Sequence, residues 1–112
     1  MTDVTDVTDA VFDHEVLEAD LPVLVKFTAD WCGPCRQLEP VLRAIAEEEH
    51  DRLKIVRIDV DRNPETTVRF GVLATPTLMV FCAGEPVKSI VGARPKRRLL
   101  QDLEDVLTPA PR

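Results

Sequence analysis

The chain contains 112 residues, of which 45% are hydrophobic and 30% are charged, and its formal net charge at pH 7 is −6. A chain of this length and apolar content is expected to form a single globular domain, residues 1–112, whose core needs no disulfide or metal cross-links. The net negative charge argues against a nucleic-acid backbone or an anionic membrane as the main partner.

The first twenty residues are acidic, with five Asp, two Glu and no Lys or Arg. A signal peptide has a basic start followed by an apolar stretch, and a membrane-spanning helix needs about 20 apolar residues. The sequence has neither pattern and predicts a cytoplasmic protein. Thiols stay reduced in that compartment, so the three cysteines are interpreted as reactive or spectator groups and not as a disulfide framework.

Apolar periodicity predicts alternating strands and helices along the chain. In chain order these are an edge strand at 2–8, a short helix capped by Asp9, a buried strand at 23–29, an amphipathic helix at 34–49, a strand at 53–60, a short helix at 64–70, a hairpin of strands 78–82 and 87–91 joined by residues 83–86, and one final helix at 95–107. Residues 108–112 are expected to form a frayed tail.

Two of these helices carry further signals. Pro40 lies inside the 34–49 helix, where it removes one backbone hydrogen bond and predicts a kink. Asn63 is the expected N-cap of the 64–70 helix, and Gly71 follows its end. The order βαβαβαββα predicts an α/β fold with a mixed sheet between helices, in which early strands run parallel and the last two form an antiparallel pair.

The segment Trp31-Cys32-Gly33-Pro34-Cys35 lies where a predicted buried strand turns into a helix. Free backbone N–H groups and the positive end of the helix dipole stabilise a thiolate at Cys32, and the thiolate is the reactive form of cysteine. Two intervening residues allow a small disulfide ring. Cys32 is therefore the predicted nucleophile on a substrate disulfide, and Cys35, expected to be the more buried thiol, resolves the mixed disulfide.

Two other interpretations of this cysteine pair are a zinc-ligand pair and a pair without catalytic function. Zinc is disfavoured because the sequence has no second CxxC, and the spacing of Cys82, His14 and His50 does not match a zinc site. No metal and no bound cofactor are expected.

The sequence resembles the thioredoxin family over nearly the whole chain. The resemblance rests on Trp31–Cys35, Pro40, Asp61–Pro64, Thr75-Pro76-Thr77 and Val91-Gly92-Ala93. It implies the thioredoxin fold, a central five-stranded mixed sheet flanked by four helices. It also implies reduction of protein disulfides through Cys32 and Cys35, with re-reduction by thioredoxin reductase at the expense of NADPH, which only the reductase binds.

The same resemblance implies a surface that accepts extended client peptides. In the family the residue before the matching proline precedes a cis peptide bond, so the Thr75-Pro76 bond is expected to be cis, leaving the Thr75 backbone free to pair with a client strand. The implied substrate-binding residues are Trp31, Gly33, Pro34, Thr75, Pro76, Gly92 and Ala93.

The sequence departs from the family on the strand before the active site. Thioredoxins usually have a buried Asp at the position of Lys26, and Arg57 matches a family Lys on the neighbouring strand. Two buried cations need a carboxylate between them. Glu39, four residues after Cys35 on the same helix face, is the candidate: it bridges Lys26 and Arg57 and exchanges the proton of Cys35. The alternative is that Glu39 points to water while Lys26 snorkels.

The formal charges of Lys26, Arg57 and Glu39 sum to +1. This net positive charge favours a thiolate at the cysteine pair and predicts a less reducing potential than is usual for the family. Two other functions stay open, a thiol oxidant or isomerase and a docking module in which redox chemistry is incidental. Cys82 is a spectator thiol or a site of oxidation or intermolecular pairing. Arg94 and residues 96–98 form a solvated basic face or select an acidic partner. A monomer is expected.

Overall fold

A computed structural model describes residues 3–107. Five strands form one sheet in the order β1-β3-β2-β4-β5. Their bounds are β1 Thr5–Asp6, β2 Val23–Thr28, β3 Lys54–Asp59, β4 Thr77–Cys82 and β5 Glu85–Val91. Strand β3 pairs in parallel with β1 and β2, whereas β4 pairs antiparallel with β2 and β5. The predicted mixed sheet is confirmed.

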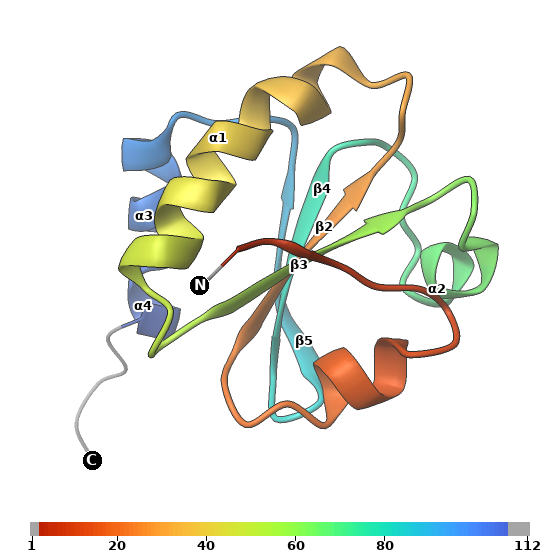
Figure 1. The fold of residues 1–112 in the computed structure, drawn as a ribbon, viewed down its shortest axis with the longest axis horizontal. Coiled ribbons are helices and arrows are strands. Elements are labelled where there is room, and N and C mark those ends of the chain that lie inside the picture. Colours follow the sequence, from red (N-terminus) through yellow and green to blue (C-terminus); the bar gives the residue numbers. More distant parts are fainter. Residues whose placement is uncertain (1–2, 108–112) are drawn as a thin grey trace.

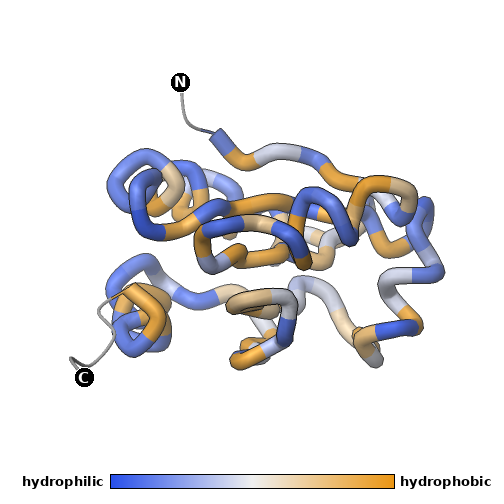
Figure 2. The backbone as a smooth tube through the Cα atoms, turned by 90° about the horizontal axis from the view of Figure 1, so that it is seen from below, coloured by the Kyte–Doolittle hydropathy of each residue, from blue (hydrophilic) through white to orange (hydrophobic). Residues whose placement is uncertain are grey.

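Helices cover both faces of this sheet (Figure 1). Helices α1 (Gly33–Glu48), α3 (Lys96–Asp102) and α4 (Glu104–Leu107) lie on one side, and the short π-helix η1 (Asp13–Leu17) lies on the other, with α2 (Pro64–Arg69) at the periphery. Two apolar clusters follow this division, one under α1, α3 and α4 and the other around η1. Figure 2 shows the hydrophobic segments gathered toward the middle of the molecule.

Alternation along β2 decides which side chains face which helices. Val23, Val25 and Phe27 belong to the cluster around η1, whereas Leu24 belongs to the cluster beneath α1. Lys26, two residues after Leu24, points to the same side as Leu24 because strand side chains alternate. The one charged residue of β2 therefore faces α1.

Three elements differ from the sequence prediction by more than one residue at a boundary. The edge strand was predicted at residues 2–8, of which residue 2 is outside the described range, but only Thr5–Asp6 form β1. The hairpin turn has two residues instead of four, since Ala83 and Gly84 both adopt positive φ (51° and 83°), as a tight turn requires, and a register shift after Val80 accommodates the early start of β5. The final helix is divided at Leu103 into α3 and α4. The predicted tail lies outside the described residues.

Asp9 does not cap the helix that follows it, contrary to the prediction. Its carboxylate instead accepts hydrogen bonds from the backbone N–H of Thr66 (2.9 Å) and Glu65 (3.2 Å) and from the Thr66 hydroxyl (2.6 Å), at the start of α2. Asn63 occupies the N-cap position of α2, but its side chain accepts from the Asp9 N–H (2.8 Å). Asp9 thus caps α2 while the Asn63 side chain binds the Asp9 main chain, and these contacts dock α2 against the N-terminal segment.

Replacing Asp9 with Ala is expected to lower the free energy of unfolding by about 1 kcal/mol at neutral pH, because α2 loses its capping acceptor. Burial raises the pKa of Asp9, but the hydrogen bonds from Thr66 and Glu65 outweigh it and hold the pKa below the ordinary 3.8. A depressed folded-state pKa means that the stabilisation is complete above 3.8 and is lost as pH falls through the folded-state value.

Urea unfolding at neutral pH and at increasingly acidic pH measures this effect. Asp20→Ala, which removes an exposed carboxylate from the same segment, is the matched control. An equal loss of stability in both variants, or an advantage of the wild type that persists at the most acidic pH, would contradict the capping role.

Candidate functional site

Cys32 and Cys35 lie at the junction of β2 and α1 and form a disulfide. Cys32 is the N-cap of α1, and its sulfur accepts a hydrogen bond from the backbone N–H of Cys35 (3.2 Å). Pro34 occupies the first turn of the helix, where a missing N–H costs nothing. Both cysteines are buried, with exposed fractions of 3% and 1%. The helix start thus presents its free N–H groups to the Cys32 sulfur, the predicted nucleophile.

The residues expected to form a client-binding surface come from three loops. Trp31 is 68% exposed, and its indole N–H donates to the Asp61 carboxylate (2.8 Å). The Thr75-Pro76 peptide bond is cis, and the Pro76 carbonyl accepts from the backbone N–H of Gly92 (2.8 Å). The loop that contains Gly92 is therefore attached to Pro76.

The sheet register places these loops together at one end of the strands. Thr77 pairs with Phe27 on β2 and with Val91 on β5, so the residues just before β4 and just after β5 lie beside the end of β2 that leads to Cys32. Gly92 has φ of 96°, a conformation that favours glycine. Gly33, Pro34 and Ala93 complete the set at the same end. The structure thus groups the predicted residues, while their role in binding stays a prediction.

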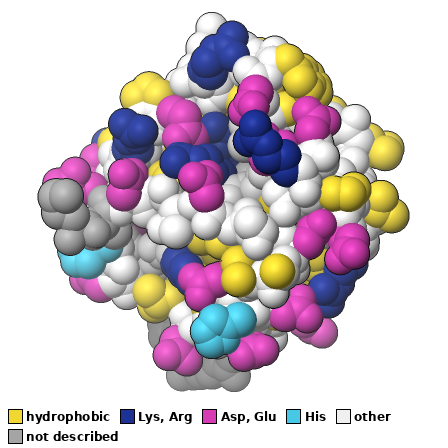
Figure 3. Space-filling view, turned by 45° about the vertical axis from the view of Figure 1, so that its right-hand side comes forward, with side chains coloured by type: hydrophobic (Ala, Val, Ile, Leu, Met, Phe, Trp, Pro, Cys, Tyr) yellow, Lys and Arg dark blue, Asp and Glu magenta, His cyan; other side chains and the backbone are white. Residues whose placement is uncertain are grey.

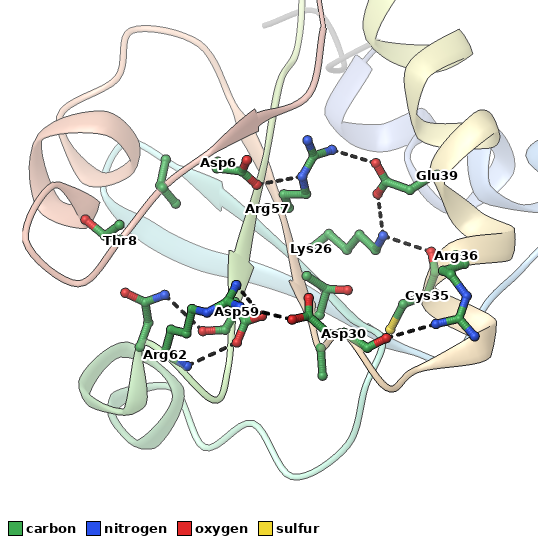
Figure 4. Close-up of a pocket in the computed structure, with 14 residues that line it drawn as sticks. Asp6, Thr8, Lys26, Asp30, Cys35, Arg36, Glu39, Arg57, Asp59 and Arg62 are labelled. Atoms are coloured by element: carbon green, nitrogen blue, oxygen red, sulfur yellow. Dashed lines mark hydrogen bonds and ion pairs between the residues drawn. The ribbon is translucent and has the colours of Figure 1, made fainter.

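A polar groove of about 550 Å³ opens behind Cys35, between α1 and the strands β1, β2 and β3 (Figure 4). Its lining is mostly charged, with cations and carboxylates in alternation, and includes Lys26, Glu39 and Arg57. Figure 3 shows a face where acidic and basic side chains lie interspersed, with Lys and Arg side chains set into a hollow. The groove gives water a route toward the active-site end of α1.

Four charged side chains form a continuous chain along this groove, here called the charge chain: Lys26, Glu39, Arg57 and Asp6. Lys26 is only 2% exposed, donates to the Cys35 carbonyl (2.8 Å) and pairs with Glu39. The other Glu39 oxygen accepts from Arg57 (2.5 Å), whose Nε donates to Asp6 (2.6 Å). The predicted bridge of Glu39 between two cations is present, and the alternative with a snorkelling lysine is wrong.

Asp6 is the member of the charge chain that sequence analysis missed. It lies directly opposite Arg57 in the parallel register of β1 and β3. Alternation in the predicted edge strand was the available signal, but it did not identify the partner. With Asp6 included, the formal charges of the four residues in the charge chain sum to zero and not to +1. The Asp6 side chain is 77% exposed, so solvent screens it far more than the buried Lys26.

The remaining candidate residues do not belong to the charge chain. Cys82 is half-buried at the end of β4, and burial together with nearby Asp105 raises the pKa of its thiol, which disfavours the reactive thiolate. In the basic face, Arg94 and Arg98 both pair with Asp102 (2.6 Å and 3.6 Å). Within residues 3–107 no cluster of three or more metal-ligating side chains occurs, and no helix is long and apolar enough to cross a membrane.

Comparison with known proteins agrees with this geometry. The thioredoxin family model matches residues 3–105. The chain belongs to the thioredoxin family. It is 48% identical over 100 residues to a thioredoxin of Alicyclobacillus acidocaldarius, covering 89% of this chain and 94% of that protein. It is 52% identical over 101 residues to a thioredoxin of Mycobacterium tuberculosis, covering 90% and 87%.

A third relative is a bifunctional thioredoxin reductase/thioredoxin of Mycobacterium leprae, 50% identical over 102 residues that cover 91% of this chain and 22% of that protein. Family membership and the Cys32–Cys35 disulfide identify this thioredoxin as a thiol-disulfide oxidoreductase of the protein-disulfide reductase type. The cysteine pair is its redox centre, and it alternates between a dithiol and a disulfide.

Lys26→Asp is expected to lower the reduction potential of the cysteine pair. The buried ammonium next to Cys35 favours the thiolate, and hence the reduced form, whereas a carboxylate there opposes it. Each kcal/mol of this preference corresponds to about 20 mV for a two-electron couple. Equilibration in a defined thiol buffer, followed by the fluorescence of Trp31, measures the potential.

Arg97→Asp is the matched control, because it changes the net charge by the same amount at an exposed residue that forms no ion pair within the described part of the chain. Equal potentials in the wild type and Lys26→Asp would refute the electrostatic effect. A similar drop in Arg97→Asp would assign the shift to net charge alone.

Proposed function

We propose that this thioredoxin transfers electrons from an NADPH-dependent thioredoxin reductase to disulfides in client proteins. The observation that carries this proposal is the Cys32–Cys35 disulfide at the start of α1. In the reduced protein the Cys32 thiolate attacks a client disulfide and forms a mixed disulfide. Cys35 then attacks the Cys32 sulfur, which closes the intramolecular disulfide and releases the client as a dithiol. NADPH acts only on the reductase, so this chain needs no bound cofactor.

Clients are proposed to bind across the loops at the end of the sheet next to Cys32. Trp31 offers an exposed aromatic surface, and the carboxylate of Asp61 restrains its indole. Gly33, Pro34, Gly92 and Ala93 have small or compact side chains, which let an extended peptide approach the sulfurs closely. The backbone of Thr75, next to cis Pro76, would pair with that peptide as an added strand.

The proposed reductant and cell compartment rest on different observations. A relative that unites thioredoxin reductase and thioredoxin in one chain supports a reductase as the electron donor. We propose the cytoplasm as the compartment, because thiols are kept reduced there. We propose a monomer, since the reaction as derived requires only one Cys32–Cys35 pair.

Catalytic turnover is expected to depend on both active-site cysteines. With thioredoxin reductase, NADPH and insulin as the disulfide-containing client, Cys32→Ser should abolish NADPH oxidation because the nucleophile is lost. Cys35→Ser should also stop turnover but should accumulate a mixed disulfide between Cys32 and the client, detectable by mass spectrometry under non-reducing conditions. Cys82→Ser, which removes the remaining thiol, is the control and should retain wild-type turnover.

Three results would overturn this proposal. Full NADPH-dependent turnover in Cys32→Ser would show that the reaction does not start at this thiol. A wild-type pair that stays reduced in a buffer more oxidising than the cytosolic glutathione pool would identify an oxidant or isomerase. If the double Ser variant still fulfils the cellular role, docking is the function and redox chemistry is incidental.

A further inference from the structure

Lys26 is a buried cation in the central part of the sheet, and both of its partners belong to the first two turns of α1. Its ammonium donates to the carbonyl of Cys35 (2.8 Å) and pairs with the Glu39 carboxylate. One ammonium group thus contacts the main chain of the resolving cysteine and a carboxylate at once. This arrangement holds Glu39 on the side of α1 that faces the groove behind Cys35 (Figure 4).

Glu39 has the position and the solvent access that a proton carrier requires. It follows Cys35 by four residues on α1, so the two side chains share a helix face, and both line the groove of about 550 Å³. The groove is large enough for ordered water, which relays protons between groups that are not in contact. The Glu39 side chain is 23% exposed, whereas Cys35 is almost completely buried.

The other carboxylates of the groove are occupied elsewhere. Asp6 is paired with Arg57 at the outer end of the charge chain. Asp30 pairs with Arg62 (3.1 Å), and Asp59 accepts from backbone N–H groups in the turn after β3 (2.9 Å and 3.1 Å). Of the carboxylates that line the groove, Glu39 is the one that shares a hydrogen-bond partner, Lys26, with Cys35.

We propose that Glu39 is the proton carrier for Cys35 and that Lys26 is the positioning residue that holds Glu39 and the Cys35 main chain together. The proposal rests on the disulfide-reductase function proposed above and assigns the proton transfer within it. Arg57 binds the second carboxylate oxygen and limits the rotation of Glu39.

In the mixed disulfide, the Cys35 thiol gives its proton through water to the Glu39 carboxylate, and the resulting thiolate attacks the Cys32 sulfur. The Cys32–Cys35 bond forms while the bond between Cys32 and the client sulfur breaks, and the client sulfur leaves with the electron pair. Glu39 then returns the proton to solvent or to the departing client thiolate. Two protein thiols are oxidised and one client disulfide is reduced.

The ionisation of Glu39 responds to the charged side chains on every element that faces it. These are Lys26 on β2, Arg57 on β3, Asp6 on β1, Arg36 on α1, and Asp30, Asp59 and Arg62 at the far wall of the groove. The wild-type rate of resolution is expected to depend on ionisation of both Cys35 and Glu39. A variant without the carboxylate is expected to depend on Cys35 alone.

The test uses the full-length reduced protein and the aromatic disulfide DTNB as a probe in stopped-flow absorbance. Attack by Cys32 releases one thionitrobenzoate in a phase whose rate grows with DTNB concentration. Resolution by Cys35 releases the second in a phase independent of that concentration. The leaving group is a stable anion that needs no proton, so the second phase reports removal of the Cys35 proton.

Glu39→Gln is expected to slow the second phase, relative to the first, by about a hundredfold or more at neutral pH, the lower end of the usual range for general-base catalysis. The difference in second-phase rate between Glu39→Gln and the wild type should shrink as pH rises, because hydroxide then removes the Cys35 proton directly. Glu47→Gln, which neutralises an exposed carboxylate farther along α1, is the matched control and should leave both phases unchanged.

The double variant Lys26→Met/Glu39→Gln guards against misfolding, because two neutral side chains of similar length replace the buried ion pair and leave neither charge unpaired by the other. It should resolve the mixed disulfide as slowly as Glu39→Gln, whereas Lys26→Met alone, which keeps the carboxylate, should resolve faster than the double variant. Wild-type second phases in Glu39→Gln and in the double variant across the pH range would overturn the proposal. Loss of the first phase in the wild type would instead refute the proposed function, so the two failures are distinguishable.

Discussion

The buried ammonium of Lys26 is the constraint on which the active-site end of this fold depends. A charge removed from water costs several kcal/mol unless it is paired and hydrogen-bonded. Lys26 is surrounded by apolar neighbours on β2, so its partners must come from the helix above it. The Cys35 carbonyl and Glu39 supply them. The same contacts that make the lysine tolerable therefore fix the start of α1, and with it the two cysteines, over the sheet.

The parallel register of the sheet extends this constraint outward. Lys26 lies opposite Arg57 on β3, and Arg57 lies opposite Asp6 on β1. Neighbouring strands are about 4.8 Å apart, so long side chains from successive strands reach a common acceptor on α1. Glu39 on α1 pairs with both of these cations, which come from the sheet beneath the helix. Changing one member leaves a neighbour unpaired, so the four residues form one electrostatic unit and not independent ion pairs.

Local signals in the sequence were sufficient for most of the fold. Period-two and period-3.6 patterns identified the strands and helices, and the cysteine spacing at a strand-to-helix junction identified the redox centre. The bridge by Glu39 was also predictable, because it followed from helix periodicity and from the need to neutralise Lys26. The cis bond at Pro76 was expected only through the resemblance to a family, since sequence alone favours trans.

The features that sequence analysis missed or misplaced depend mostly on contacts between distant segments. Asp9 caps a helix 57 positions away, and Arg57 finds Asp6 across 51 positions. A capping residue is normally assigned to the helix that follows it, because no sequence pattern reveals which helix end lies nearby in space. The hairpin turn was local but depended on a positive φ at Ala83, which composition does not favour. Misassignment thus occurred where tertiary packing or an unusual backbone conformation overrode local preference.

The charge chain bears on the direction of electron flow. Lys26, Glu39 and Arg57 are shielded from solvent, whereas Asp6 is exposed and screened, so the shielded part of the charge chain keeps a net charge of +1 although the four formal charges cancel. This net charge favours the thiolate and raises the potential. A preference of 1.4 kcal/mol corresponds to about 30 mV, while about 150 mV separates thioredoxin from the strong periplasmic oxidants. One buried ion pair thus adjusts the potential within the range of a reductase, and reversing the flux would require several such changes around the same cysteine pair.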